Sequence, residues 1–280
     1  MGYRTILVHL NDERRCDRLL AQAIALADRF EAHLIGIYVA PQPIIYAEWP
    51  GAGLGEVIEQ VRQEHAATAE RLRAKFNTAT SALPRPAEWR FVQSLMASVA
   101  SDVIAFGRSA DLIVASQADP AWHQSNDMDV PDRLAIESGR PVLVVPNSAK
   151  QPMSARRITI GWNDRREGAR AVFDALPLLK KAEAVNVVWV SPRVGGIDEG
   201  DLPGSELCRT LARHGVSCEA SWAEAADSGV GSELLRQAKA HGSDLLVMGA
   251  YGHSRLREFV LGGASRHALA KAEIAVLMSH

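Results

Sequence analysis

Residues 157–179 read RITIGWNDRREGARAVFDALPLL, and residues 4–26 read RTILVHLNDERRCDRLLAQAIAL. Each stretch begins with a short apolar run, continues with Asn-Asp and a group of charges, and ends with apolar residues at helical spacing. That order indicates a buried strand followed by an amphipathic helix. The match between the two stretches indicates that the chain contains one structural unit twice.

The same strand and helix pattern continues on either side of these stretches. In the first half we expect strands and helices alternately at Thr5–Leu10, 12–30, His33–Val39, within Val57–Phe76, Glu88–Gln93, about Ala97–Gly107, Asp111–Ser116 and, after a variable stretch and a helix, Pro141–Pro146. Three later segments, AVNVVWVSP, SDLLVMGA and IAVLMS, match AHLIGIYVAP, ADLIVASQ and RPVLVVP in the same order. Continuous apolar strands that alternate with helices indicate a parallel sheet covered on both faces. We therefore predict an α/β fold of two tandem Rossmann-like or flavodoxin-like domains, each a five-stranded parallel sheet with helices on both faces.

A polar stretch separates the two copies. Residues 147–155 read NSAKQPMSA, a proline-containing break of the kind that joins domains. We place the two domains at residues 1–147 and 155–280.

Composition narrows the class of protein. The chain has 280 residues, a formal net charge of −2 and 47% hydrophobic residues, which gives no reason to expect nucleic acid or an anionic membrane as a partner. No apolar run approaches the roughly 18 residues that span a bilayer, and the first strand ends at Asn-Asp too early for a signal peptide. The three cysteines are few and unpatterned, and although Cys208 and Cys218 could bridge, we expect a reduced, cytoplasmic protein.

A glycine-rich loop follows the fourth strand of the second copy. Residues 248–263 read MGAYGHSRLREFVLGG and lead into a predicted helix. Ligands of parallel α/β sheets bind at the carboxyl ends of the strands. Glycines at a helix N-terminus leave its N–H groups open to an anion. This is the chemistry of a phosphate cradle; the alternative is that the glycines only form turns and caps.

The spacing Gly249-x2-Gly252-x9-Gly262 resembles the G-x2-G-x9-G-(Ser/Thr) motif of the universal stress protein family, and the likeness extends over both copies. The resemblance implies ATP binding, with phosphates on the glycines and the hydroxyl and with adenosine on an Asp after the first strand. Here Gly263 stands at the hydroxyl position, Ser265 follows two residues later, and Asn163 replaces the Asp. The implied nucleotide-binding residues are Asn163, Gly249, Tyr251, Gly252, His253, Gly262, Gly263, Ala264 and Ser265.

The first copy has lost this loop. Residues 116–134 read SQADPAWHQSNDMDVPDRL, without a glycine, and Ser116 and Asp119 stand where Gly249 and Gly252 do. Four acidic residues would repel phosphates there: Asp119, Asp127, Asp129 and Asp132. We therefore expect that the first domain does not bind ATP in the manner of the family and serves as a fixed partner of the second.

Other candidate residues and motifs give weaker evidence of a functional site. Tyr251 and His253 could stack on a base or contact a phosphate, or form an exposed loop tip, and His267 is more typical of a helix surface. We find no His-x3-His or Cys-x2-Cys pair, so no metal site is expected beyond Mg²⁺ carried by ATP. GHSRL lacks the second glycine of a nucleophile elbow. Asp12 and Asp164 are interpreted as helix N-caps.

These expectations describe a cytoplasmic stress-response protein that binds ATP in its C-terminal domain and acts as a nucleotide-dependent regulator, not an enzyme, with slow hydrolysis still open. The resemblance also implies that Val142–Val145 pairs with Ala275–Met278 as an internal pseudo-dimer. An unknown protein partner and a homodimer of whole chains are left open. Two alternatives are a nucleotide-independent scaffold and a carrier of another small ligand in the altered loop of the first domain.

Overall fold

The computed structural model describes residues 2–42, 54–94, 98–191, 202–225, 229–250 and 263–280. The first half contains β1 (Thr5–His9), α1 (Glu13–Phe30), β2 (His33–Ala40), α2 (Leu54–Thr80), β3 (Glu88–Gln93), α3 (Val99–Gly107), β4 (Leu112–Ser116), α4 (Ser125–Met128), α5 (Pro131–Glu137) and β5 (Val142–Val145). The second half contains β6 (Arg157–Trp162), α6 (Arg166–Asp174), α7 (Leu176–Leu179), β7 (Ala184–Ser191), α8 (Ser205–Arg213), β8 (Cys218–Glu224), α9 (Val230–Ala240), β9 (Leu245–Gly249), α10 (Gly263–Lys271) and β10 (Ala275–Ser279). The predicted alternation of strands and helices is confirmed.

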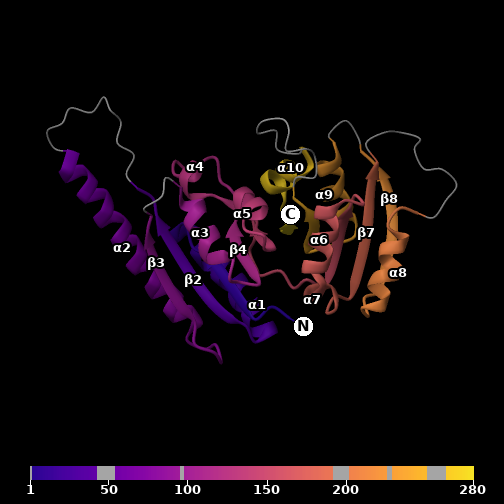
Figure 1. Ribbon diagram of the computed structural model, residues 1–280, viewed down its shortest axis with the longest axis horizontal. Coiled ribbons are helices and arrows are strands. Elements are labelled where there is room, and N and C mark those ends of the chain that lie inside the picture. The colour runs from indigo at the N-terminus through magenta and orange to yellow at the C-terminus, as the bar shows by residue number, and fades with distance from the viewer. Residues whose placement is uncertain (1, 43–53, 95–97, 192–201, 226–228, 251–262) are drawn as a thin grey trace.

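All strands of the described chain form one sheet in the order β3-β2-β1-β4-β5-β10-β9-β6-β7-β8. Within each half the neighbouring strands are parallel, as the apolar strand pattern predicts. The halves meet at β5 and β10, which pair antiparallel with Leu143 opposite Leu277. The predicted internal pairing is therefore present, and it joins the two five-stranded sheets into a continuous one (Figure 1).

The core lies on both faces of this sheet, because β1, β4, β5 and β10 are buried along their length or nearly so. Helix α1 illustrates why the local sequence folds as it does. Its apolar residues recur at helical spacing and are buried, among them Leu19, Leu20 and Leu26. Asp12 precedes it and accepts a hydrogen bond from the N–H of Arg14, which confirms the predicted N-cap.

The matching prediction for Asp164 is wrong. Helix α6 begins one residue later, with Arg165 at the cap position, and Asp164 has φ 52°, in the left-handed region. Asn163 makes the local bond at this point, because its Oδ1 accepts the N–H of the cap residue Arg165 at 3.2 Å. The Asn-Asp pairs of the two halves therefore divide the capping role differently.

The polar stretch between the halves is bonded to α1. The N–H of Met153 donates to Gln22 Oε1 at 2.8 Å, and Arg29 donates to the carbonyl of Ser154 at 2.6 Å. The predicted domain boundaries at residues 147 and 155 fall between β5 and β6.

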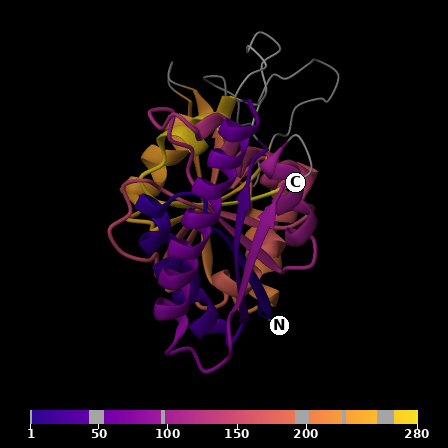
Figure 2. The same ribbon diagram turned by 90° about the vertical axis from the view of Figure 1, so that its left-hand side faces the viewer.

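The two halves differ most in the helix that follows their second strand. Helix α2 has 27 residues and runs along the outer side of the first half, whereas α8 has nine (Figures 1 and 2). Ion pairs join α2 to α1: Arg71 lies 2.8 Å from Glu13, and Lys75 lies 3.0 Å from Asp17. The first half is thus covered over a much greater length than the second.

Candidate functional site

The carboxyl end of β9 and the start of α10 form the base of the predicted glycine loop. Ser265 is buried in the first turn of α10, with its Oγ 3.5 Å from the carbonyl oxygen of Gly249. Gly263 is exposed, and a Cβ added there would meet no atom of the described residues within 4 Å. The structure therefore brings Gly249 and Ser265 together and places no other described residue against Gly263, the first residue of α10. The predicted site residues Tyr251, Gly252, His253 and Gly262 lie outside the described residues.

Gly249 is required by packing. A Cβ at this position would lie 2.6 Å from Cγ of Glu167 and 2.7 Å from the carbonyl carbon of the same residue. The first turn of α6 thus lies directly against the end of β9, where only glycine fits. This glycine has a structural reason that is independent of any ligand.

Asn163, the predicted adenosine contact, is held by neighbouring groups. Its Nδ2 donates to Oε1 of Glu167 at 3.0 Å, while its Oδ1 accepts the N–H of Arg165. Glu167 is 5% exposed, and its Cγ and backbone lie against Gly249 while its carboxylate is bonded to Asn163. Sequence reasoning missed Glu167; its signal is an acid in the first turn of a helix that faces the glycine loop.

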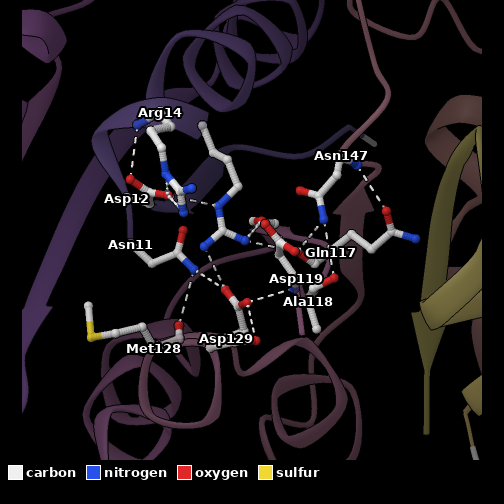
Figure 3. Close-up of polar contacts among 12 residues, drawn as sticks. Asn11, Asp12, Arg14, Gln117, Ala118, Asp119, Met128, Asp129 and Asn147 are labelled. Carbon is white, nitrogen blue, oxygen red and sulfur yellow. Dashed lines mark hydrogen bonds and ion pairs between the residues drawn. The ribbon is translucent and has the colours of Figure 1, made fainter. Parts of the chain in front are cut away.

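The altered loop of the first half closes around its own carboxylate (Figure 3). Asp129 lies 2.9 Å from the guanidinium of Arg15, and the two side chains are 1% and 3% exposed. The same carboxylate accepts hydrogen bonds from Asn11 Nδ2 at 2.6 Å, the N–H of Asp119 at 2.8 Å and Ser125 Oγ at 2.7 Å. Buried charges are normally paired in this way.

This network corrects the prediction of four acidic residues that act alike. Asp129 is neutralised by Arg15 and does not present a free negative charge at the loop. Its carboxylate occupies the position beside Arg15 that an external anion would need. Trp122 covers the guanidinium of Arg15, with the ring centroid 4.5 Å from Cζ. Sequence reasoning missed Arg15; its signal is a charged residue at an otherwise apolar position of α1.

Two titratable groups beside Arg15 have shifted pKa values. Burial and the charge of Arg15 lower the pKa of His9, at the end of β1, to about 3. Burial acts to raise the pKa of Asp12, but hydrogen bonds from Arg14 outweigh it and hold that pKa below its ordinary value. Both effects leave His9 neutral and Asp12 ionised at neutral pH.

The first half also caps the last helix of the second half. Nε2 of Gln117 donates to the carbonyl oxygens of Leu269 at 2.9 Å and Ala272 at 3.2 Å. Its Oε1 accepts the N–H of Asn147 at 2.9 Å. Helix α10 thus begins at the glycine loop and ends on a side chain from the altered loop, between the two halves (Figure 1).

A cavity of about 950 Å³ lies beside this contact. Its walls come from the altered loop, from α3 and α5 of the first half, and from α10 of the second; they include Pro120, Val130, Leu269 and Ala270. In the described part of the chain no group of three or more His, Cys, Asp or Glu residues could hold a metal ion. No described helix is long and apolar enough to cross a membrane.

Comparison with known proteins agrees with this geometry. The model of the universal stress protein family matches residues 223–280, which include β9, the glycine loop and α10. The sequence of this segment is therefore similar to that of the family. The whole chain shares its fold with a universal stress protein from Archaeoglobus fulgidus DSM 4304, at 14% identity and a TM-score of 0.76 over 98% of this chain and 95% of that one.

A second solved structure supports the same architecture. A functionally unknown protein from Pseudomonas aeruginosa PAO1 aligns with 99% of this chain and 92% of its own, at 18% identity and a TM-score of 0.60. No curated protein sequence matches the chain. The shared fold therefore covers both halves, while the family model matches the end of the second.

Proposed function

We propose that this chain is a nucleotide-dependent regulator that binds ATP, with Mg²⁺, at the glycine loop of its second half. The observation that carries the proposal is the match of residues 223–280 to the universal stress protein family, together with the geometry of that segment. The strand β9 ends at Gly249 where α10 begins nearby, and Ser265 lies against that glycine. The nine-residue helix α10 offers the N–H groups and the favourable dipole of its first turn to a phosphate.

The carboxylate of Glu167 is the reason to expect a divalent cation together with the nucleotide. Cγ of this residue lies against Gly249, so the carboxylate would repel nucleotide phosphates that approach the loop. Mg²⁺ binds carboxylate and phosphate oxygens together. We therefore expect this chain to favour Mg-ATP over free ATP.

Helix α10 supplies a route from ligand to response. Its start belongs to the glycine loop, and its end is held by Gln117 of the first half. A ligand bound at the loop would shift the balance between positions of α10, and the first half would present that change to a partner. We propose binding and signalling rather than turnover, with any hydrolysis of ATP slow.

The test begins with freshly purified protein. Denaturation should release ATP or ADP near one per chain, identified by chromatography and mass spectrometry, and calorimetry should show Mg-ATP binding at one site. Gly252→Asp should abolish that binding without unfolding the chain. Asp119→Gly, at the equivalent position of the first half, is the matched control and should leave affinity unchanged. If no nucleotide is released and Mg-ATP gives no heat of binding, the proposal is refuted and a nucleotide-independent scaffold is favoured. For such a scaffold, Gly252→Asp should not affect function.

A second candidate function rests on the cavity of about 950 Å³ at the altered loop. It would make the chain a carrier of a small ligand other than an adenine nucleotide. A non-adenine species should then be released on denaturation and should be lost in Ala270→Trp, which fills the cavity from the exposed side of α10. Retention of that species by the variant would reject this function.

A further inference from the structure

Three tryptophans stand side by side on the outer strands of the second half. Trp162 on β6 is the register partner of Trp189 on β7, and Trp189 is the partner of Trp222 on β8. Register partners in a parallel sheet point to the same face. Trp222 is 45% exposed, and so is Phe173 on α6. Large aromatic side chains are therefore gathered on this side of the sheet without being fully buried.

In the first half, the positions equivalent to Trp162 and Trp189 are part of the buried core. In the sequence repeat, Asn11-Asp12 matches Asn163-Asp164. Leu10 of the first half is therefore equivalent to Trp162 of the second, and Ala21 is equivalent to Phe173. The strand register within each half then makes Tyr38 on β2 equivalent to Trp189 on β7. Leu10 is 0% and Tyr38 2% exposed, and the hydroxyl of Tyr38 lies 2.6 Å from His65 on α2.

The second half has larger side chains under a shorter cover. The nine residues of α8 stand where the 27 residues of α2 lie in the first half. A groove of about 550 Å³ remains between α6 and α8, lined by Trp162, Trp189, Phe173 and Leu207. Small-molecule sites have this size and this aromatic lining. Exposed apolar surface that is not needed for packing marks a binding site.

The charges around the groove limit its ligand. Among the described residues that line it, the ionised side chains are the carboxylates of Asp164 and Glu206. Arg209 lies 3.0 Å from Glu206, so that carboxylate is partly neutralised, but no described lining residue is a cation. The groove therefore disfavours an anion, and aromatic faces favour a flat ring or a cation.

We propose that the groove between α6 and α8 binds a planar aromatic small molecule that is neutral or positively charged. This site is separate from the glycine loop. Gly249 contacts α6 in its first turn, at Glu167, whereas Phe173 lies two turns later on the helix and faces α8. The proposal does not depend on nucleotide binding.

The test uses the full chain labelled with 5-fluorotryptophan and three probes that share an indole ring. Tryptamine is cationic, tryptophol is neutral and indole-3-acetate is anionic. The chain contains six tryptophans, whose ¹⁹F resonances are assigned by single Trp→Phe substitutions. Tryptamine and tryptophol should shift the Trp162 and Trp189 resonances saturably, and indole-3-acetate should bind at least about threefold more weakly because of the carboxylates. Trp122, in the first half, should not move.

Phe173→Ala restores the residue of the first half and should weaken tryptamine binding by about tenfold, the effect of losing one aromatic contact. Phe91→Ala, which removes a similarly exposed ring from β3, is the matched control and should have no effect. Saturating Mg-ATP should change the affinity less than about twofold, since independent sites do not couple. The proposal is overturned by absent shifts up to about 5 mM probe, by equal affinity for all three probes, by shifts spread equally over all tryptophans, or by displacement with Mg-ATP.

Discussion

The carboxylate of Asp129 lies 2.9 Å from the guanidinium of Arg15, and both side chains are almost completely buried. One partner follows β4 and the other is in the first turn of α1, so the pair ties the altered loop to the first helix. The first half thereby contains its own anion at the place that corresponds to the glycine loop and the start of α10 in the second half.

Removing that anion should destabilise the chain and make the site responsive to an external one. Asp129→Ala removes the nearer carboxylate from buried Arg15 and leaves it the longer contact with Asp12 at 3.5 Å, and breaking a buried pair costs about 3–5 kcal/mol in comparable cases. Formate or inorganic phosphate at millimolar concentration should recover part of the loss, measured as the midpoint of urea unfolding. Asp127→Ala, at an exposed position of the same loop, should change little and show no anion dependence. If the variant loses stability and neither anion restores any of it, Asp129 acts through packing alone.

Gly249 and Gly263 should respond differently to the same substitution. Gly249→Ala forces a Cβ to within 2.6 Å of Glu167, so overpacking should cost about 1–3 kcal/mol in the absence of any nucleotide. Gly263→Ala meets no atom of the described residues within 4 Å and should leave the free energy of unfolding within about 0.5 kcal/mol of the parent. Chemical denaturation of the two variants checks this. Similar stability of both would contradict the packing role assigned to Gly249.

His9 should make the chain less stable as the pH falls from neutrality. Its pKa is about 3 in the folded chain and 6.5 in the reference state, so between these values the unfolded chain takes up a proton that the folded chain excludes. The contribution is complete above pH 6.5 and is lost at about 1.4 kcal/mol per pH unit below it. His9→Gln should reduce the slope of unfolding free energy between pH 6.5 and 5 by about that amount. An unchanged slope would show that His9 is protonated in the folded chain.

Glu167 should control the metal dependence of nucleotide binding. Glu167→Gln keeps the acceptor for Asn163 Nδ2 and removes the charge beside Gly249. Free ATP should then bind about tenfold more tightly than to the parent, the equivalent of about 1.4 kcal/mol, and the difference between ATP and Mg-ATP should narrow. Calorimetric titrations with and without EDTA measure both. If the difference stays the same, the carboxylate does not face the phosphates.

The fold could be predicted from sequence because it depends on local, repeated signals. Apolar strands, helical spacing and the duplicated Asn-Asp stretch identify the elements, and the family resemblance supplies the pairing of Val142–Val145 with Ala275–Met278. The Arg15–Asp129 pair has no such signal, because it joins two charges from separate elements. The row of tryptophans becomes visible only once strand register places Trp162, Trp189 and Trp222 together. The capping error at Asp164 arose from one left-handed residue, which the residue types do not reveal.

The antiparallel contact between β5 and β10 has a consequence for how the two halves can change. In an assembly of two identical chains, every substitution is present twice, and a loss at one site is a loss at both. Here the corresponding strands belong to a single chain, so each half accumulates its own substitutions. One half can have an internal ion pair where the other has a glycine loop, and the other can have aromatic side chains beside a shorter helix. Because both halves belong to one chain, they can differ in their sites, which two identical chains in a symmetric dimer could not do.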